Sequence, residues 1–277
     1  MVKLQRIDYP KYDYWCYGAP VSDTAEGIEN MGDGPVVAII LDKFNSGTDY
    51  ALNRCYIDML IENGLSVAFI THENPADQLA KVKPAGMLLP GGFFQIPPEF
   101  IDAPYVKKEL DLRHFDAYMT AFDYAHENTL PTFGICAGMQ MIACKLGGKT
   151  IGGPLGKVNA ATPPIHMNIA EFATPSKRDL EHIVSVEKDS LLYKITKTNT
   201  LTVTSRHNSK IVESTGGDFK ITARAPDGVI EAIEPLTPWN EFVLGVQWHP
   251  EKIAVLDASS ADAKLFQEFA RVVKGSQ

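Results

Sequence analysis

The sequence predicts an α/β fold in three layers, with a mostly parallel sheet flanked by helices. The first observation is that short apolar runs alternate with amphipathic helical patterns between residues 35 and 146. Such an alternation is typical of a parallel sheet with helices on its faces. The second observation is a change of pattern after about residue 150, where short strand-like segments follow one another. These segments predict an added antiparallel strand region in the C-terminal half.

The composition indicates an ordinary globular protein. The chain has 277 residues, of which 45% are hydrophobic and 22% charged. This length suffices for one large or two small domains. Because no repeat, low-complexity tract or linker is visible, we predict one domain over 35–277. Residues 1–34 are rich in Tyr, Pro, Gly and acidic residues and predict an irregular N-terminal arm. Its aromatic side chains favour packing on the domain or on a second subunit over a ligand pocket.

The net charge and the hydropathy of the sequence limit the kinds of partner expected for this protein. The net charge of -8 argues against nucleic acid and anionic membranes. No apolar run approaches the roughly 18 residues of a membrane span, and the N-terminus lacks the apolar core of a signal peptide. None of the four cysteines forms a Cys-x-x-Cys pair. We therefore expect a cytoplasmic protein with reduced thiols that acts on a small molecule and is compatible with a homodimer.

The first half of the chain predicts the parallel sheet. Its strands are short, apolar and often β-branched, as buried parallel strands are. They are expected at 35–41, 65–70, 86–89 and 132–135. Apolar residues at helical spacing predict the helices between them. These are expected near 48–63, near 75–82, near 105–127, and from residue 136 to residue 146.

The second half predicts the antiparallel region and a closing helix. Turn signals such as Pro226-Asp227-Gly228 separate its segments. The strands are expected at 166–172, 183–187, 200–204, 219–225, 229–234 and 242–247. The helix is expected near 259–274, with an apolar stripe that ends in Val272 and Val273.

The most informative stretch is Gly134-Ile135-Cys136-Ala137-Gly138. Gly-x-Cys-x-Gly between a strand and a helix resembles a nucleophile elbow, where the nucleophile adopts a strained conformation and flanking Cβ atoms would collide. Cys136 would then lie at a helix N-terminus, which favours the thiolate. A lone cysteine is also commonly a small buried hydrophobe, and the motif alone leaves the two interpretations balanced. Cys144, two turns further on, is expected in the core, without a disulfide to Cys136.

A base and an acceptor that orients it are available for Cys136. A cysteine nucleophile needs both within hydrogen-bond reach. His249 and Glu251 follow the apolar run that ends at Gln247. Positions i and i+2 of an extended segment point the same way, so the carboxylate can reach the far imidazole nitrogen. Both this run and the strand before Cys136 should end at the ligand-binding edge of the sheet.

Candidate oxyanion donors lie close to the same edge. The amide of Ala137 follows the nucleophile, and Gly91 and Gly92 end the neighbouring strand. Pro90-Gly91-Gly92 taken alone is more commonly an ordinary turn. His72, His114, His126 and His182 have no matching partner in the sequence and are expected on the surface or in the core. No spacing suggests a metal site, and no motif predicts a cofactor.

Three motifs together resemble the class I glutamine amidotransferase superfamily. They are Leu89-Pro90-Gly91-Gly92-Phe93, Gly134 to Gln140, and Gly245 to Glu251. The resemblance covers roughly residues 35–273 and implies a flavodoxin-like fold and attack of a cysteine on a γ-carboxamide. It implies that Cys136 is the nucleophile, His249 the base and Glu251 its orienter. Gly92 and Ala137 would supply oxyanion amides, with Gly91 and Gln140 as further substrate-binding candidates.

Within this superfamily the chain is most similar to the free-standing γ-glutamyl hydrolases, including the γ-glutamyl-γ-aminobutyrate hydrolase type. The similar segments are Leu112 to Asp116, Gly147 to Thr150 and Val203 to His207. The last segment implies that Ser205 and His207 line the substrate pocket. Ala137 stands where those hydrolases commonly have Arg, and Asn208-Ser209 replaces their usual His-Gln. Both differences leave the identity of the substrate open.

Three functions are therefore compatible with the sequence. The first is a hydrolase of γ-glutamyl amide bonds that forms a γ-glutamyl thioester and needs no cofactor. The second is a glutaminase subunit that delivers ammonia to a separate synthase partner. The third is a non-hydrolytic binding or stress protein of the same fold. Such relatives usually lose the His-Pro-Glu segment, which this chain keeps as His249-Pro250-Glu251.

Overall fold

A computed structural model describes residues 14–17, 33–44, 49–92, 95–102, 110–152, 166, 180–207, 209–213 and 217–276. Most of the predicted N-terminal arm lies outside these residues. So do part of the helix expected near 105–127 and the strand expected at 166–172, of which only His166 is described.

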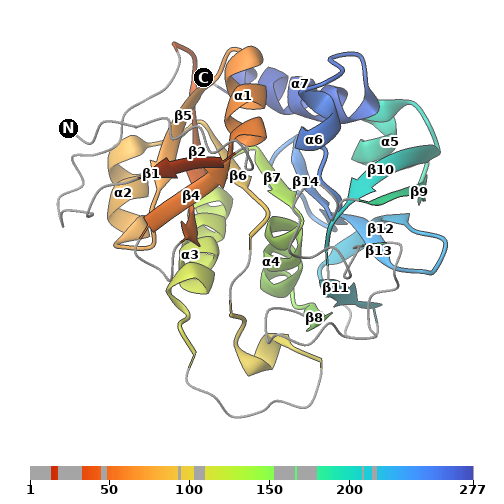
Figure 1. Cartoon of the computed structure of the whole chain (residues 1–277), viewed down its shortest axis with the longest axis horizontal. Helices are drawn as coiled ribbons and strands as arrows, with labels where there is room; N and C mark the ends of the chain where they lie inside the picture. Colours follow the sequence, from red (N-terminus) through yellow and green to blue (C-terminus); the bar gives the residue numbers. More distant parts are fainter. Residues whose placement is uncertain are drawn as a thin grey trace.

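A nine-stranded sheet organises the molecule (Figure 1). Its order is β10-β9-β12-β13-β14-β7-β6-β2-β5. The parallel strands are β2 (Val36–Ile40), β5 (Ser66–Ile70), β6 (Gly86–Leu89), β7 (Thr132–Ile135) and β14 (Val243–Val246). Numbered by their own sequence order, these five strands stand 2-1-3-4-5 across the sheet, which is the flavodoxin-like arrangement. The predicted fold class is confirmed.

Helices cover both faces of the sheet (Figure 1). One face carries α1 (Arg54–Glu62), α5 (Leu191–Thr196), α6 (Glu251–Ala254) and α7 (Ala261–Gly275). The other carries α2 (Pro75–Val82), α3 (Arg113–Glu127) and α4 (Ala137–Lys145). In β2, Val37 and Ile39 pack into the first core, whereas Ala38 and Ile40 pack into the second. The apolar run is continuous because both faces of a parallel strand are covered.

The C-terminal half adds the antiparallel region that the sequence predicts. β9 (Leu180–Val186), β10 (Thr200–Ser205), β12 (Phe219–Arg224) and β13 (Ile230–Pro235) extend the main sheet. β13 pairs antiparallel with β14 and so joins the extension to the parallel part. The sequence analysis missed α5 and a separate pair formed by β8 (Lys149–Gly152) and β11 (Ser209–Val212).

Two helix predictions start too early. The helix expected from residue 48 begins at Arg54, because 49–53 form β4 (Asp49–Asn53). β4 pairs with β1 (Tyr14–Tyr17) on one side and β3 (Asp42–Phe44) on the other, so tertiary pairing overrides the helical periodicity. The Asn53 side chain then caps α1 by accepting the amide of Cys55. The helix expected from residue 105 begins at Arg113, and residues 110–112 precede it without helical structure.

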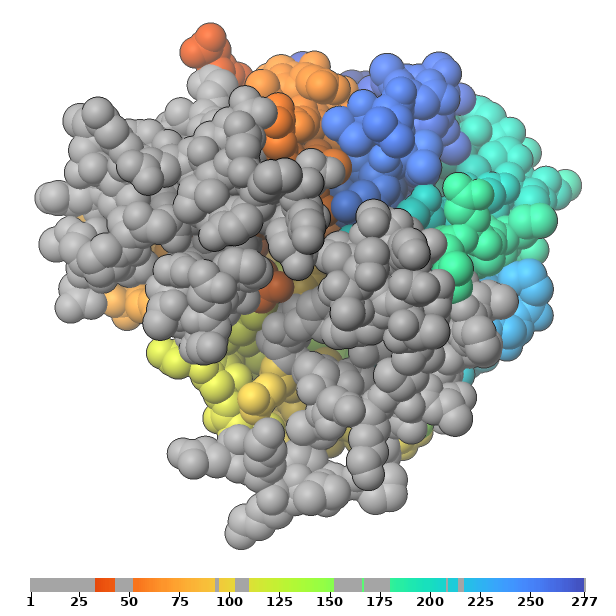
Figure 2. Space-filling model, viewed as in Figure 1, coloured from red at the N-terminus to blue at the C-terminus, as the bar shows by residue number. Residues whose placement is uncertain are grey.

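The strand β1 was not predicted, because residues 1–34 were expected to form an irregular arm. On the surface, the orange helix α1 adjoins the blue helices α6 and α7 (Figure 2).

Among the described residues, no helix has both the length and the apolar character needed to cross a membrane.

Candidate active site

The turn between β7 and α4 holds Cys136 in a strained conformation. Its φ and ψ angles are 52° and -105°, which side chains other than glycine rarely adopt. A Cβ on Gly134 would lie 2.5 Å from Ile142 Cδ1, and one on Gly138 would lie 1.9 Å from the Leu89 carbonyl oxygen. Both flanking positions therefore require glycine. The backbone geometry expected of a nucleophile elbow is confirmed.

The neighbouring strand brings the histidine to this turn. β7 and β14 run parallel with Ile135 opposite Val246, and the Cys136 amide donates to the Val246 carbonyl over 2.7 Å. The chain beyond β14 therefore starts level with the elbow and reaches His249 three residues later. The His249 amide donates to the Thr204 carbonyl over 2.9 Å, which ties this turn to β10.

His249 and Glu251 form a buried hydrogen-bonded pair. His249 Nδ1 lies 2.8 Å from Glu251 Oε1, and the Glu251 side chain is fully buried. Burial lowers the pKa of His249, but the negative charges of Glu251 and Cys136 outweigh burial and raise that pKa to about 9. Burial raises the pKa of Glu251, yet the interaction with His249 outweighs it and holds that pKa below its ordinary value. These two pKa directions describe an imidazolium paired with the Glu251 carboxylate.

Gly91 lies where the side chains of Cys136 and His249 meet. A Cβ on Gly91 would lie 2.8 Å from His249 Cε1 and 3.4 Å from Cys136 Cβ. The same Cβ would lie 3.0 Å from the hydroxyl of Tyr56. The space around these groups thus depends on the absence of a side chain at position 91.

Tyr56 on α1 is a site residue that was not predicted from the sequence. Its hydroxyl accepts the Gly91 amide over 3.0 Å and lies 3.4 Å from His249 Nδ1. Burial and the charge of Glu251 raise the pKa of Tyr56 well above its usual value, so the hydroxyl stays protonated. A tyrosine in a helical apolar stripe carries no signal of such a role, because its position relative to His249 depends on the packing of α1.

The expected oxyanion donors differ in their availability. The Gly91 amide is already engaged by Tyr56. Ala137 is the first residue of α4, where backbone amides have no acceptor within the helix. A Cβ on Gly92 would lie 3.2 Å from Asp42 Oδ2 and 3.5 Å from His114 Cε1, so Gly92 borders a further polar pair.

His72 and His114 have the partners that the sequence did not reveal. His114 Nδ1 lies 3.2 Å from Asp42 Oδ1, and His72 Nε2 lies 2.7 Å from the Leu41 carbonyl oxygen. The two buried rings stack with their centroids 4.1 Å apart. His72 lies between β5 and α2 and His114 lies on α3, so spacing in the sequence cannot indicate their contact. His126 is exposed and contacts the ring of Trp239, as expected for a surface residue.

Three predicted substrate-binding residues lie deeper in the protein and contact other protein groups. Gln140 Nε2 donates to the Ser209 carbonyl over 3.2 Å and to Gln247 Oε1 over 3.0 Å. The Ser205 hydroxyl donates to the His166 carbonyl over 3.0 Å. His207 Nδ1 donates to the same Ser209 carbonyl over 2.9 Å. Their contact with a substrate stays a prediction.

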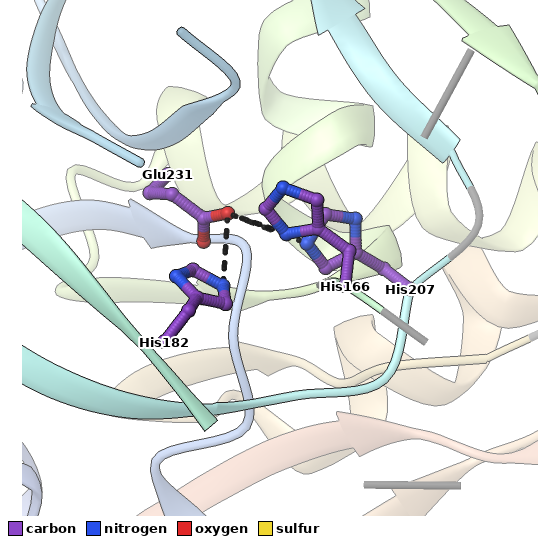
Figure 3. Close-up of side chains that lie close together, drawn as sticks. All are labelled: His166, His182, His207 and Glu231. Atoms are coloured by element: carbon purple, nitrogen blue, oxygen red, sulfur yellow. Dashed lines mark ion pairs between the residues drawn. The ribbon is translucent and has the colours of Figure 1, made fainter. Parts of the chain in front are cut away.

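A second cluster of ionisable side chains lies in the antiparallel extension. We call His166, His182, His207 and Glu231 the His–Glu cluster (Figure 3). Their potential ligand atoms lie within 4.8 Å of one another, and all four residues are buried. His182 therefore has partners, contrary to the sequence analysis. The residues come from four separate segments, so no local spacing could reveal a group able to hold a metal ion.

Comparison with known proteins assigns the family. The Peptidase C26 pattern matches residues 35–251, and the chain belongs to this family. The chain is 27% identical over 239 residues to the gamma-glutamyl-gamma-aminobutyrate hydrolase of Escherichia coli O157:H7, covering 81% of this chain and 88% of that protein. It is also 27% identical over 203 residues to the CTP synthase of Staphylococcus aureus strain NCTC 8325, covering 66% of this chain and 33% of that protein. The family and the hydrolase relative support a hydrolase.

A solved structure agrees with the fold. The glutaminase domain of Trypanosoma brucei CTPS with bound acivicin superimposes with a TM-score of 0.59 at 18% sequence identity. The match covers 87% of this chain and 94% of that domain. At this level of identity the likeness concerns the arrangement of sheet and helices.

Proposed function

We propose that this chain, as a member of the Peptidase C26 family, hydrolyses γ-glutamyl amide bonds with Cys136 as nucleophile. The observation that carries the proposal is the meeting of three groups at one edge of the sheet. Cys136 stands in a strained elbow, His249 lies beside it at Gly91, and Glu251 holds His249 Nδ1 over 2.8 Å. The hydrolase relatives at 27% identity support the same substrate class.

The first half of the reaction forms a thioester. Because Nδ1 of His249 is bound to Glu251, its Nε2 is the nitrogen available to Cys136. The Cys136 sulfur attacks the γ-carbonyl carbon, and the carbonyl oxygen becomes an oxyanion facing the amides of Ala137 and Gly92. The carbon–nitrogen bond then breaks, and His249 gives its proton to the departing amine. The products at this stage are a free amine and a γ-glutamyl thioester on Cys136.

The second half releases glutamate. A water molecule gives a proton to His249 and attacks the thioester carbon. The carbon–sulfur bond breaks, and Cys136 leaves as the thiolate beside the imidazolium. A raised pKa of about 9 for His249 supports a protonated imidazole at neutral pH. Glu251 keeps the ring oriented and stabilises its positive charge through both halves.

The test is glutamate release by the purified chain alone. Glutamine, γ-glutamyl-γ-aminobutyrate and a γ-glutamyl peptide are offered in parallel, with Cys136→Ala as the inactive variant. Cys144→Ala is the matched control, because Cys144 is a second buried cysteine on the same helix. We expect release from at least one γ-glutamyl amide, lost only in Cys136→Ala. Turnover that survives in Cys136→Ala would exclude the mechanism.

A partner-dependent glutaminase is the second candidate. It is favoured by the likeness to a CTP synthase and to the glutaminase domain of a CTPS. In this case the released ammonia would pass to a separate synthase. Glutaminase activity that appears only when a partner protein is added would select this function over the free-standing hydrolase.

A further inference from the structure

The His–Glu cluster combines features that an ordinary buried polar group avoids. His166, His207 and Glu231 are at most 2% exposed, and His182 is 8% exposed. Five of their nitrogen and oxygen atoms are buried without a well-formed hydrogen bond: His166 Nδ1, His182 Nε2, His207 Nε2, Glu231 Oε1 and Glu231 Oε2. Buried polar atoms are normally satisfied, and leaving one unpaired is costly. A group that binds all of them at once would remove this cost.

The distances inside the cluster fit ligands around an ion. Glu231 Oε1 lies 3.3 Å from His166 Nδ1, 3.4 Å from His207 Nε2 and 3.5 Å from His182 Nε2. These are long for charge-assisted hydrogen bonds, which measure about 2.7–2.9 Å. Ligand atoms bound at about 2.0–2.1 Å to a tetrahedral zinc ion lie about 3.3–3.4 Å from one another. The three distances from Glu231 Oε1 therefore match edges of a tetrahedron around a metal ion, and all four potential ligand atoms lie within 4.8 Å of one another.

The outer ring nitrogens orient the three imidazoles. His166 Nε2 donates to Asp227 Oδ2 over 3.0 Å, and His207 Nδ1 donates to the Ser209 carbonyl over 2.9 Å. His182 Nδ1 donates more weakly to the Ile183 carbonyl over 3.3 Å. The inner nitrogens of the three rings are directed toward Glu231 (Figure 3). When the rings are neutral and their outer nitrogens donate, these inner nitrogens carry lone pairs. Lone pairs and a carboxylate facing one another repel unless a cation lies among them. Metal-bound histidines typically have such outer partners.

We infer that His166, His182, His207 and Glu231 form a binding site for a divalent transition metal ion of the zinc class. Three imidazole nitrogens and one carboxylate oxygen complete a four-coordinate set, and none of the four side chains is exposed. A closed, buried set of four protein ligands is the mark of a structural site, because a catalytic site keeps one position open. This inference is independent of the proposed hydrolase function.

The place of the cluster in the fold indicates what the ion would stabilise. His182 lies on β9, Glu231 on β13, and His207 directly precedes β11, while His166 belongs to none of these strands. The ion would therefore cross-link the antiparallel extension. The Ser209 carbonyl, which orients His207, also accepts from Gln140 on the elbow helix α4. This extension and the elbow are thus joined through one carbonyl oxygen.

The alternative is a cluster that holds protons in place of a metal. Imidazolium rings could pair with Glu231 and satisfy the same atoms. Two or three positively charged rings within 4.8 Å would repel one another, which disfavours the protonated cluster. The side chains would nevertheless need no different positions in the protonated cluster than in the metal-bound cluster. Metal analysis separates the two, because only the metal site responds to zinc and to chelators.

The experiment uses the full, untagged chain, since a polyhistidine tag would itself bind zinc. Metal content is measured by mass spectrometry on the purified protein and after treatment with a strong chelator. Zn²⁺ is then added back to the stripped protein, and Co²⁺ is used in a parallel sample for its visible absorption. We expect about one Zn²⁺ per chain, the intense bands of tetrahedral Co²⁺, and a rise of the unfolding temperature by about 5 °C on adding Zn²⁺.

Two cluster variants and one control locate the site. Glu231→Gln and His182→Gln should each lower the zinc affinity at least about 10-fold and remove the tetrahedral Co²⁺ spectrum. His126→Gln is the control, because His126 is exposed and lies outside the cluster. Circular dichroism verifies that the variants fold. If a variant does not fold, the zinc and cobalt measurements on the wild-type chain test the inference. Absence of zinc binding by the stripped wild-type chain, or equal binding by the cluster variants and the control, would overturn the inference.

Discussion

The two buried histidine–carboxylate groups of this protein use the same chemistry at different distances. At the edge of the parallel strands, one imidazole meets Glu251 at 2.8 Å, a hydrogen-bond length that leaves its second nitrogen for Cys136. In the antiparallel extension, three imidazoles surround Glu231 at 3.3–3.5 Å, too far apart for good hydrogen bonds. The first arrangement suits proton transfer, whereas the second suits a bound cation. The proposed catalytic pair, at 2.8 Å, and the proposed metal ligands, at 3.3–3.5 Å, thus differ in the distance between imidazole nitrogen and carboxylate oxygen.

The largest expected effect is a loss of turnover at the Cys136 site that leaves zinc binding by the His–Glu cluster unchanged. Cys136→Ser should lower turnover of a γ-glutamyl amide by at least about 10⁴-fold, because the attacking group is lost while the fold is kept. Its zinc content should equal that of the wild type, measured on the same preparation. Cys144→Ser serves as control and should retain turnover. A zinc content that falls with Cys136→Ser would show that the two regions are not separate.

The substitution of Glu by Gln should affect different properties at Glu251 and at Glu231. Glu251→Gln removes the charge that raises the pKa of His249 to about 9, so the ring deprotonates at lower pH. The alkaline limb of kcat/KM should therefore move from near pH 9 toward neutral pH, and turnover should fall by roughly 10²–10⁴-fold. Glu231→Gln should instead lower the zinc content and the unfolding temperature, while the position of the alkaline limb stays near pH 9. Both variants are compared through complete pH profiles and metal analysis.

His249→Ala gives the loss of turnover with which the loss in Glu251→Gln is compared. It should cost more turnover than Glu251→Gln, because the base is lost and not merely misoriented. The reverse order in steady-state assays would mean that the assigned roles of His249 and Glu251 are wrong.

A smaller effect is expected at Gly91, where the absence of a side chain leaves room for Cys136 and His249. Gly91→Ala would place a methyl group 2.8 Å from His249 Cε1 and 3.0 Å from the Tyr56 hydroxyl. Displacement of the ring should lower kcat by roughly 10²-fold with little change in zinc content. Gly275→Ala is the control, because a Cβ there meets nothing within 4 Å. Unchanged kcat in Gly91→Ala would show that the pair tolerates a shift.

The smallest effect concerns a third buried carboxylate, which has no histidine beside it. Burial raises the pKa of Asp262 to about 7, although Trp248 Nε1 donates to it over 3.0 Å. Because the folded state binds this proton more tightly than the unfolded state, the stabilisation is present below about pH 4 and is lost as pH rises through about 7. Asp262→Asn keeps an acceptor for Trp248 and should stabilise the protein by roughly 1–3 kcal/mol at pH 8 but not at pH 4.

Thermal unfolding at several pH values measures this difference. Asp77→Asn is the matched control, since Asp77 is exposed in the first turn of α2 as Asp262 is buried in the first turn of α7. A stability gain that is equal at pH 4 and pH 8 would contradict the raised pKa of Asp262. Together the three carboxylates test whether nearby imidazoles keep buried acids ionised in this fold.

The parts of the fold that were predicted correctly depend on local patterns. The continuous apolar runs predicted the parallel strands, because a strand covered on both faces has no polar side. Gly134 and Gly138 predicted the elbow through their spacing around Cys136, although the clash that excludes a Cβ at Gly138 is with Leu89 on the neighbouring strand β6. The pair of His249 and Glu251 was predicted correctly, but the extended segment expected to align them was wrong, because Pro250 has helical backbone angles and Glu251 begins α6.

The parts that were missed depend on segments far apart in the chain. β4 replaces the start of a predicted helix because strands β1 and β3 pair with it. Tyr56 reaches His249 only because α1 packs beside α6. The hydrogen bond from Gln140 to the Ser209 carbonyl likewise joins distant segments, and contact of Gln140 and His207 with a substrate stays a prediction.

Sterics and hydropathy within a few residues were thus sufficient to indicate the layered fold, the elbow and the pair that follows β14. The His–Glu cluster required the completed sheet. Its members lie on β9, on β13, before β11 and at residue 166, and no two of them share a local motif. Only the packing of these segments brings three imidazoles around one carboxylate, because ligand geometry acts over distances in space and not along the chain.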